Sequence, residues 1–261
     1  MGPFLADAFD RAVTATIENW KIGIIACLVV ASVRLLDDST RYHLASLGVA
    51  LLSAAPAVVV AGRAIGNRAP AAAGSVIRFL WSYLAWSVMF FASLIMFFVV
   101  FAGGVILAAL SHGAAGQADF TSLPATVFGA VLAFVAVLAT TALLSRLLLA
   151  QFAGFVEGLG VRAAFRRALV LTRGLYWRNL AVVLVTVVAT ALPDLIAFGI
   201  AILTFRIFGS PWTEATDQSH IRLAATIALP ARWYGIVAFF VAMLRYYERL
   251  RARHAEVTTG A

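Results

Sequence analysis

Six long apolar segments, separated by polar loops, constrain the fold of this chain more than any other feature of its sequence. They span about residues 20–36, 43–62, 79–110, 124–150, 179–206 and 222–245. A helix needs about 20 apolar residues to cross a bilayer. A soluble domain is about half apolar and a quarter charged, whereas here 63% of the residues are hydrophobic and 12% are charged. We therefore predict one all-α, polytopic membrane domain, residues 1–261, with six transmembrane helices.

The basic residues fall mainly in alternate loops. If the N-terminus is cytoplasmic, the outer loops contain only Arg34, Arg41, Arg206 and Arg222. Fifteen basic residues then lie on the cytoplasmic side, namely Arg11, Lys21, Arg63, Arg68, Arg78, Arg146, Arg162, Arg166, Arg167, Arg173, Arg178, Arg245, Arg249, Arg251 and Arg253. Cytoplasmic loops of membrane proteins carry an excess of lysine and arginine, so we predict that both termini are cytoplasmic. Topology also explains the net charge of +8, and we predict no nucleic-acid partner.

The most basic window of the chain is residues 161–177, VRAAFRRALVLTRGLYW. On a helix, its apolar side chains gather on one side and its arginines on the other. Such a helix is typical of the membrane interface, although an ordinary cytoplasmic loop helix is the other interpretation. We predict amphipathic interfacial helices on the cytoplasmic side, here and over residues 3–19. The candidate residues for binding anionic lipid or a partner membrane protein are Arg162, Arg166, Arg167, Arg173, Trp177 and Arg178.

Two parts of the sequence resemble a known family. The first contains Glu157-Gly158, Ala164, Arg167, Leu171-Thr172-Arg173-Gly174 and Tyr176-Trp177-Arg178. It is similar to the signature of the membrane domain of glycerophosphoryl diester phosphodiesterases and of its stand-alone, multi-pass bacterial relatives of unknown function. The second, Tyr246-Tyr247-Glu248-Arg249-Leu250-Arg251, resembles the closing Tyr-x-x-Leu-Arg element of the family.

The resemblance covers about residues 145–180 and 243–253 well, and Ala168 stands where the family often has serine. No long polar segment remains to build the soluble phosphodiesterase barrel. The resemblance therefore implies a membrane fold in the bacterial cytoplasmic (inner) membrane, and not an esterase activity.

Asp194 and Arg232 are charged residues inside the fifth and sixth apolar segments, close to Pro193 and Pro230. At about 1.5 Å per residue, both lie roughly 20 Å from the cytoplasmic ends of their segments. Neighbouring antiparallel helices would bring them together, and an isolated charge at that depth is costly. We predict an intramembrane ion pair, which is either structural or part of a gate or substrate site in a polar cavity.

The other polar residues give weaker patterns. Gln151 and Glu157, near the end of the fourth segment, are expected to pair with the arginines that follow. His43, His112 and His220 fall in the three outer loops and could ligate zinc, but their spacing matches no ligand motif. We therefore predict no metal site and no cofactor. Because no nucleophile elbow, phosphate loop, HExxH motif or pair of catalytic carboxylates appears, we also predict that the chain is not an enzyme.

Two functions are compatible with these patterns, and a third, an orphan lipid-metabolising enzyme, would need an acid–base constellation that the sequence does not show. The first is a non-enzymatic role in membrane or envelope organisation, in which the arginine-rich segment binds anionic lipid or another membrane protein. The alternative is a small transporter or channel that uses Asp194 and Arg232 in a central cavity. A water-filled cavity that reaches both residues would favour transport, whereas a dry, closely packed pair would favour a structural role.

Overall fold

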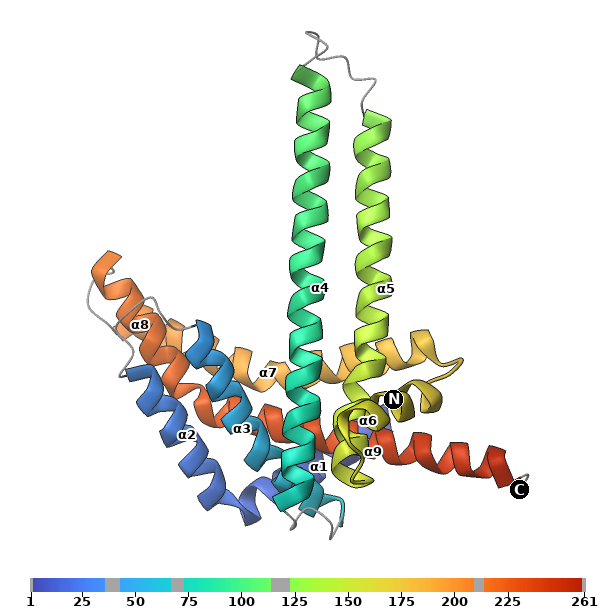
Figure 1. Ribbon diagram of the computed structural model, residues 1–261. Helices are drawn as coiled ribbons and strands as arrows, with labels where there is room; N and C mark the ends of the chain where they lie inside the picture. The colour runs from blue at the N-terminus through green and yellow to red at the C-terminus, as the bar shows by residue number, and fades with distance from the viewer. Residues whose placement is uncertain (1, 36–42, 67–72, 114–122, 209–213, 260–261) are drawn as a thin grey trace.

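The computed structural model describes residues 2–35, 43–66, 73–113, 123–208 and 214–259. Nearly all of these residues are helical and none is in a strand, which confirms the all-α prediction. The helices are α1 (Gly2–Glu18), α2 (Trp20–Leu35), α3 (His43–Ala64), α4 (Ala73–Gly113), α5 (Leu123–Val156), α6 (Val161–Leu171), α7 (Tyr176–Phe208), α8 (Glu214–Ile227) and α9 (Leu229–Thr259). α4 and α5 form a long hairpin that stands out from the other helices (Figure 1).

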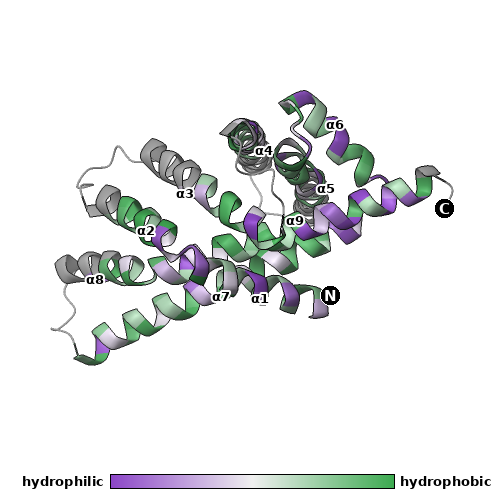
Figure 2. Cartoon of the chain, turned by 90° about the horizontal axis from the view of Figure 1, so that it is seen from below, coloured by the Kyte–Doolittle hydropathy of each residue, from purple (hydrophilic) through white to green (hydrophobic). Residues whose placement is uncertain are grey.

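The other helices are organised around α9. α7 packs along α9, and the two run across the base of the α4–α5 hairpin, which Figure 2 shows nearly end-on. α1 and α3 also pack on α9, and α6 packs mainly on α5. The inward face of α9 is fully buried at Val237, Val241, Leu244 and Tyr247. Apolar residues at this spacing of three or four place a continuous stripe against the neighbouring helices.

An aromatic cluster joins the base of the hairpin to α9. Phe79 of α4 contacts Phe152, Phe155 and Phe240, with ring centroids 5.5 to 6.3 Å apart. Tilted and edge-on contacts at these distances stabilise aromatic pairs beyond the apolar area that they bury. The cluster therefore holds α4, α5 and α9 together at the end of the hairpin that lies nearest the candidate sites.

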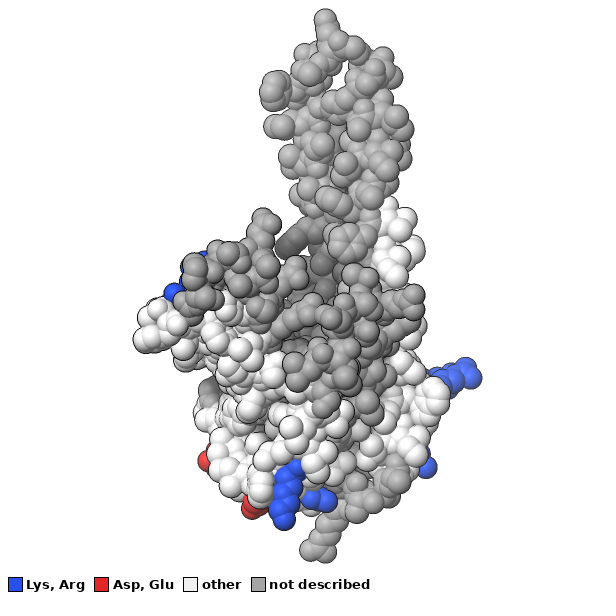
Figure 3. All heavy atoms as spheres, turned by 90° about the vertical axis from the view of Figure 1, so that its left-hand side faces the viewer, with Lys and Arg blue, Asp and Glu red and all other residues white. Residues whose placement is uncertain are grey.

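The described helices support membrane insertion, but they show fewer clear spans than the six predicted. Among the described residues, Gly74–Ser93, Val137–Val156 and Tyr176–Phe208 are long and apolar enough to cross a membrane, and the bent pair α1–α2 is a possible fourth. Only 28% of the α7 window is buried, so most of its apolar side chains face outward. An exposed apolar surface of this extent is typical of lipid contact. On the face shown in Figure 3, the described lysines and arginines lie near the edges.

The first and last predicted spans are helical, but neither is a single helix long enough to cross a membrane within the predicted bounds. α2 has 16 residues, which gives a length of about 24 Å, less than the hydrocarbon core of a bilayer. The predicted span 222–245 is divided between α8 and α9, with the break at Ala228. Pro230 is the second residue of α9. Because proline lacks the N–H that continues a helix but is tolerated in a first turn, it favours a new helix at this point.

α1 and α2 meet at an angle of 84°, and Asn19 lies between them. Its Nδ2 donates to the Ala15 carbonyl oxygen at 2.9 Å, and its Oδ1 accepts from Arg63 of α3 at 2.7 Å. The backbone N–H of Asn19 also donates to the Ala15 carbonyl oxygen, so Asn19 links the end of α1 to α3 through its backbone and its side chain. The predicted amphipathic segment 3–19 is therefore a separate helix, whose alanine face, Ala8, Ala12 and Ala15, is buried.

Candidate functional site

The arginine-rich segment is shorter as a helix than its sequence pattern predicts. α6 ends at Leu171, and α7 begins at Tyr176. Gly174 in the intervening turn has a φ of +75°, a left-handed conformation that glycine adopts at little cost and that commonly ends a helix. Trp177 and Arg178 therefore belong to the first turn of α7, and Arg173 belongs to the turn. The single helix predicted over residues 161–177 is wrong in this respect.

The two faces of α6 have different surroundings. Ala164, Ala168 and Leu171 are buried, and α6 packs mainly on α5, so its apolar face contacts protein. Arg162 and Arg166 on the other face are exposed. Small side chains such as alanine allow two helices to approach closely. The apolar side chains left for contact with lipid come from the rim of α6 and from the start of α7.

Glu157, just after α5, is the centre of a polar junction. Tyr247 of α9 donates its O–H to Glu157 Oε1 at 2.6 Å, and Arg167 Nε lies 3.2 Å from Oε2. Arg251 Nε lies 3.7 Å from Oε1. The expected pairing of Glu157 with arginines is confirmed, whereas Gln151 is fully buried and neither its Nε2 nor its Oε1 has a hydrogen-bond partner in the described part. The two segments that carry the family resemblance thus meet at this Glu157 junction.

A second polar group fixes the turn between α6 and α7. Arg146 Nε donates to Thr172 Oγ1 at 2.8 Å, and its Nη2 donates to the Leu169 carbonyl oxygen at 2.9 Å. The guanidinium also lies 4.7 Å from the centre of the Tyr176 ring. A cation at the C-terminal end of a helix satisfies its last carbonyls and its dipole. This role of Arg146 was not predicted from the sequence, although a charge inside a predicted apolar segment (124–150) requires a partner.

Asp194 of α7 and Arg232 of α9 are in direct contact. Arg232 Nε and Nη2 both lie 2.9 Å from Asp194 Oδ2, so the contact expected from their depths is present. The two side chains are 22% and 34% exposed, whereas Asp194 Oδ1 is buried and has no hydrogen-bond partner in the described part. The geometry is that of a charge-assisted pair at the edge of an apolar interior, and its role in function remains a prediction.

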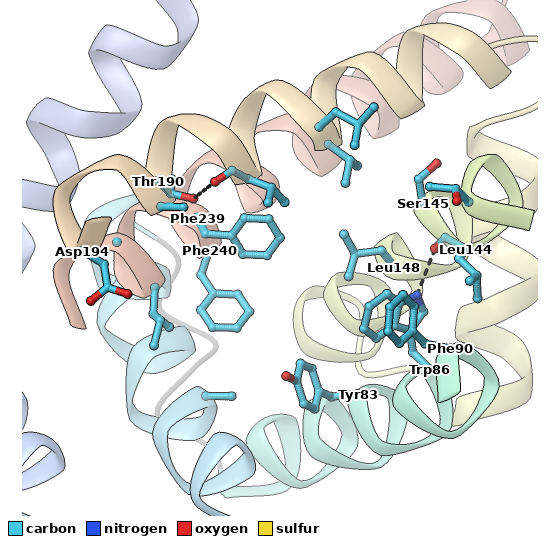
Figure 4. A pocket seen from close by; sticks show the side chains of 18 of the residues that line it. Tyr83, Trp86, Phe90, Leu144, Ser145, Leu148, Thr190, Asp194, Phe239 and Phe240 are labelled. Atoms are coloured by element: carbon cyan, nitrogen blue, oxygen red, sulfur yellow. Dashed lines mark hydrogen bonds between the residues drawn. The ribbon is translucent and has the colours of Figure 1, made fainter. Parts of the chain in front are cut away.

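The ion pair lies at one end of a cavity of about 510 Å³. Figure 4 shows Asp194 at this end and Trp86, Leu144 and Ser145 at the other. The cavity lies between α3, α4, α5, α7 and α9, and its lining is mainly aliphatic and aromatic. Such a lining binds apolar groups, while the few polar groups orient the ligand.

The histidines do not form a site in the described part of the chain. His220 of α8 stacks on Phe205, with ring centroids 5.4 Å apart. The side chains of His43 and His112 lie outside the described residues. Figure 1 places the C-terminal end of α4, which carries His112, far from α8. Among the described residues, no group of three or more potential metal ligands occurs.

Removing one partner of the ion pair is expected to destabilise the fold more than neutralising both. Arg232→Ala leaves Asp194 charged, partly buried and without its cation, whereas the double variant Asp194→Asn/Arg232→Gln keeps two hydrogen-bonding amides. We expect a free energy of unfolding about 1–2 kcal/mol lower for Arg232→Ala than for the double variant. Thermal unfolding in detergent measures the difference. Equal melting temperatures for the two variants would contradict the prediction.

Comparisons of the chain with protein-family models, with curated proteins and with solved structures give no match. Three features of the described part bear on function. These are the exposed arginines at α6 and its C-terminal turn, the Glu157 junction, and the cavity with its ion pair.

Proposed function

We propose that this chain is a non-enzymatic membrane protein that binds anionic lipid head groups through an arginine surface, defined as Arg162, Arg166, Arg173 and Arg178. The observation that carries the proposal is uncompensated charge. All four side chains are exposed, and none forms an ion pair with another described residue. Guanidinium groups match the oxygens of a phosphate with paired N–H donors, so a phosphate-bearing head group is a suitable counter-ion.

Apolar side chains beside the arginines support a lipid as the ligand. Trp177 is 63% exposed and Val170 is 50% exposed. Tryptophan is enriched at the level of lipid head groups, where its ring has one apolar and one polar side. Each basic residue near an anionic membrane contributes about 1 kcal/mol. Four basic residues are enough for an inserted protein to select anionic lipids from those around it, although they would not anchor a soluble protein to a membrane.

Arg167 is excluded from this surface. It was predicted to bind lipid with the other arginines, but its guanidinium contacts Glu157 and is therefore neutralised. We assign Arg167 to the structural junction between α5, α6 and α9. The proposed lipid-binding surface therefore contains four of the five arginines that the sequence pattern predicted.

The proposal includes a location and a wider role. We place the arginine surface at the cytoplasmic face of the bacterial inner membrane, with both termini cytoplasmic, as the positive-inside distribution favours. α6 lies near the base of the α4–α5 hairpin, away from its tip (Figure 1). The role would be in membrane or envelope organisation, as the resemblance to stand-alone membrane domains also suggests. A membrane protein with an acidic surface is the alternative partner.

Transport has less support than lipid binding. The cavity reaches Asp194 and Arg232, but apolar side chains dominate its lining. A polar solute or ion would lose its hydration there without receiving enough replacement hydrogen bonds. The pair therefore does not lie in the kind of polar path that a channel for ions requires.

Native mass spectrometry of the protein in a mild detergent tests the proposal. Dioleoyl phosphatidylglycerol and dioleoyl phosphatidylcholine are the anionic and zwitterionic probes. The double variant Arg162→Gln/Arg166→Gln should bind phosphatidylglycerol about 30-fold more weakly than the native chain, because two contributions of about 1 kcal/mol are lost. Binding of phosphatidylcholine should change little. Arg167 stays intact in this variant, so that the Glu157 junction is preserved.

A second pair of exposed charges provides the matched control. Lys21→Gln/Arg249→Gln removes the same charge from exposed positions on α2 and α9, and Arg249 lies over the Phe4 ring of α1. We expect it to keep most of the affinity for phosphatidylglycerol. An equal loss in both double variants would show that only net charge matters, and it would contradict a specific arginine surface. If the native chain instead retains an acidic protein and no lipid, the result would favour the alternative partner, a membrane protein with an acidic surface.

A further inference from the structure

The cavity beside the ion pair is separate from the arginine surface on α6 and needs its own explanation. Its volume of about 510 Å³ lies within the range of about 300–1,000 Å³ typical of sites for small molecules. Figure 4 shows Tyr83 and Trp86 of α4 on one side of it and Phe239 and Phe240 of α9 on the other. Walls of this kind favour a hydrocarbon chain over a polar solute. The volume suits a single chain better than a whole phospholipid.

The cavity opens beside exposed apolar side chains. Phe90, Leu184 and Val187 line it and are themselves exposed. All three lie in the candidate membrane spans of α4 and α7. A water-soluble ligand would have to cross an apolar surface to enter here, whereas a lipid would enter directly from the hydrocarbon region.

The ion pair has spare hydrogen-bonding capacity. Trp86 Nε1 and the Ser145 hydroxyl, at the far end of the cavity, and the Thr190 hydroxyl, beside Asp194, already donate to backbone carbonyl oxygens (Figure 4). In contrast, Asp194 Oδ1 has no partner in the described part. Arg232 uses Nε and Nη2 to bind Asp194 Oδ2, and a guanidinium has five N–H donors in total. A polar head group therefore finds both an acceptor and donors at the ion pair.

The charge of this end indicates which head group fits. Asp194 and Arg232 neutralise each other, so a carboxylate or phosphate would compete with Asp194, and an ammonium group would compete with Arg232. A hydroxyl can donate to the carboxylate and accept from the guanidinium without separating them. We infer that the cavity binds an uncharged lipid, with its hydrocarbon chain between α4 and α9 and a hydroxyl-bearing head group at the Asp194–Arg232 pair.

Titration of the detergent-extracted full chain with monooleoylglycerol, followed by native mass spectrometry, tests this inference. We expect one lipid to bind per chain. Val187→Trp fills the cavity and should weaken binding at least about 10-fold, which corresponds to about 1.4 kcal/mol. The matched control is Val188→Trp, because Val188 is the next residue of α7, is exposed and does not line the cavity. It should bind within about 2-fold of the native chain.

The head group is tested with oleate, which has the same chain and a carboxylate. We expect oleate to bind at least about 10-fold more weakly than monooleoylglycerol. If Val187→Trp does not fold, as judged by its thermal unfolding, then Ala191→Phe fills the same cavity with a smaller side chain. Equal affinity of the cavity variant and its control, or no binding to the native chain, would overturn the inference. Equal binding of oleate would overturn the assignment of the head group.

The outcome is independent of the proposed arginine surface. The Arg162→Gln/Arg166→Gln variant should still bind monooleoylglycerol normally, because neither arginine lines the cavity. Loss of phosphatidylglycerol with retention of monooleoylglycerol would establish two separate sites. Loss of both in that variant would show that the arginines act on the cavity, and it would contradict the separation of the sites.

Discussion

Replacing Gly235 with alanine is expected to lower the free energy of unfolding by about 3 kcal/mol, at the upper end of the usual cost of overpacking a core. A Cβ atom at Gly235 would overlap the carbonyl oxygen of Thr190 on α7. This oxygen belongs to the helix backbone, so it cannot move aside as a flexible side chain could. Glycine is therefore required where α9 passes α7, in the way that small residues permit close crossings between membrane helices.

Thermal unfolding in detergent, followed by circular dichroism at 222 nm (a helix signal), measures this effect. For a chain of this size, about 3 kcal/mol corresponds to a decrease of about 6–12 °C in Tm. Gly199→Ala is the matched control, because no atom of another part of the chain lies within 4 Å of the position of its Cβ. This control should be neutral or slightly stabilising, since alanine favours a helix over glycine. A Tm for Gly235→Ala equal to that of the control would show that α7 and α9 do not pack this closely.

The second large effect is expected for Glu157→Ala. Its carboxylate, only 15% exposed, accepts the Tyr247 O–H and contacts Arg167 and Arg251. Alanine would leave the buried Tyr247 hydroxyl without an acceptor and Arg167 without a counter-ion. We expect a loss of about 2–3 kcal/mol, less than for a fully buried pair because water can reach both arginines.

Two controls accompany Glu157→Ala in the same unfolding measurement. Glu18→Ala removes a carboxylate from an exposed position and should change stability little. Arg251→Gln should also have a small effect, because the Arg251 side chain is 52% exposed and lies 3.7 Å from the carboxylate, as is usual for weak surface pairs. A loss for Glu157→Ala no greater than that of Glu18→Ala would contradict a structural junction.

The same junction predicts a direction of pH dependence. Burial, and then the hydrogen bond to Glu157, raise the pKa of Tyr247. The folded state therefore holds this proton more tightly than the unfolded state. The resulting stabilisation is complete below the pKa of about 10 of an unfolded tyrosine and is lost as the pH rises through the higher folded value. The contribution of Tyr247 to stability is accordingly constant near neutral pH.

Several elements follow directly from local patterns in the sequence. The apolar segments are helical because their residues are apolar over many turns, although the last of them is divided between α8 and α9, and the 3–19 pattern corresponds to α1. The contact of Asp194 with Arg232 followed from the depth of two charges in antiparallel helices. The contact of Glu157 with Arg167 followed from the run of arginines that comes directly after Glu157 in the sequence. These are properties of residues, or of distances along a helix, that the chain carries by itself.

Other features depend on contacts between distant segments. The break at Ala228 and the end of α6 before Gly174 occur within windows that are uniformly apolar or amphipathic. Hydropathy averaged over a window cannot place such breaks, because single backbone conformations and side-chain bonds decide them. Arg146 was missed for the same reason, since its partners Thr172 and Leu169 are more than twenty residues away.

The sequence by itself determined an all-helical chain with helices apolar enough to cross a membrane, an arginine-rich segment and a pair of opposite charges. Helix period, apolar length and the cost of an unpaired charge act locally, so they can be evaluated from the order of residues. Only the tertiary structure decided that α7 and α9 cross the base of the α4–α5 hairpin and enclose a cavity at the ion pair. Crossing directions and cavities arise from how side chains of different helices fill space together, as at Gly235, and no single segment contains that information.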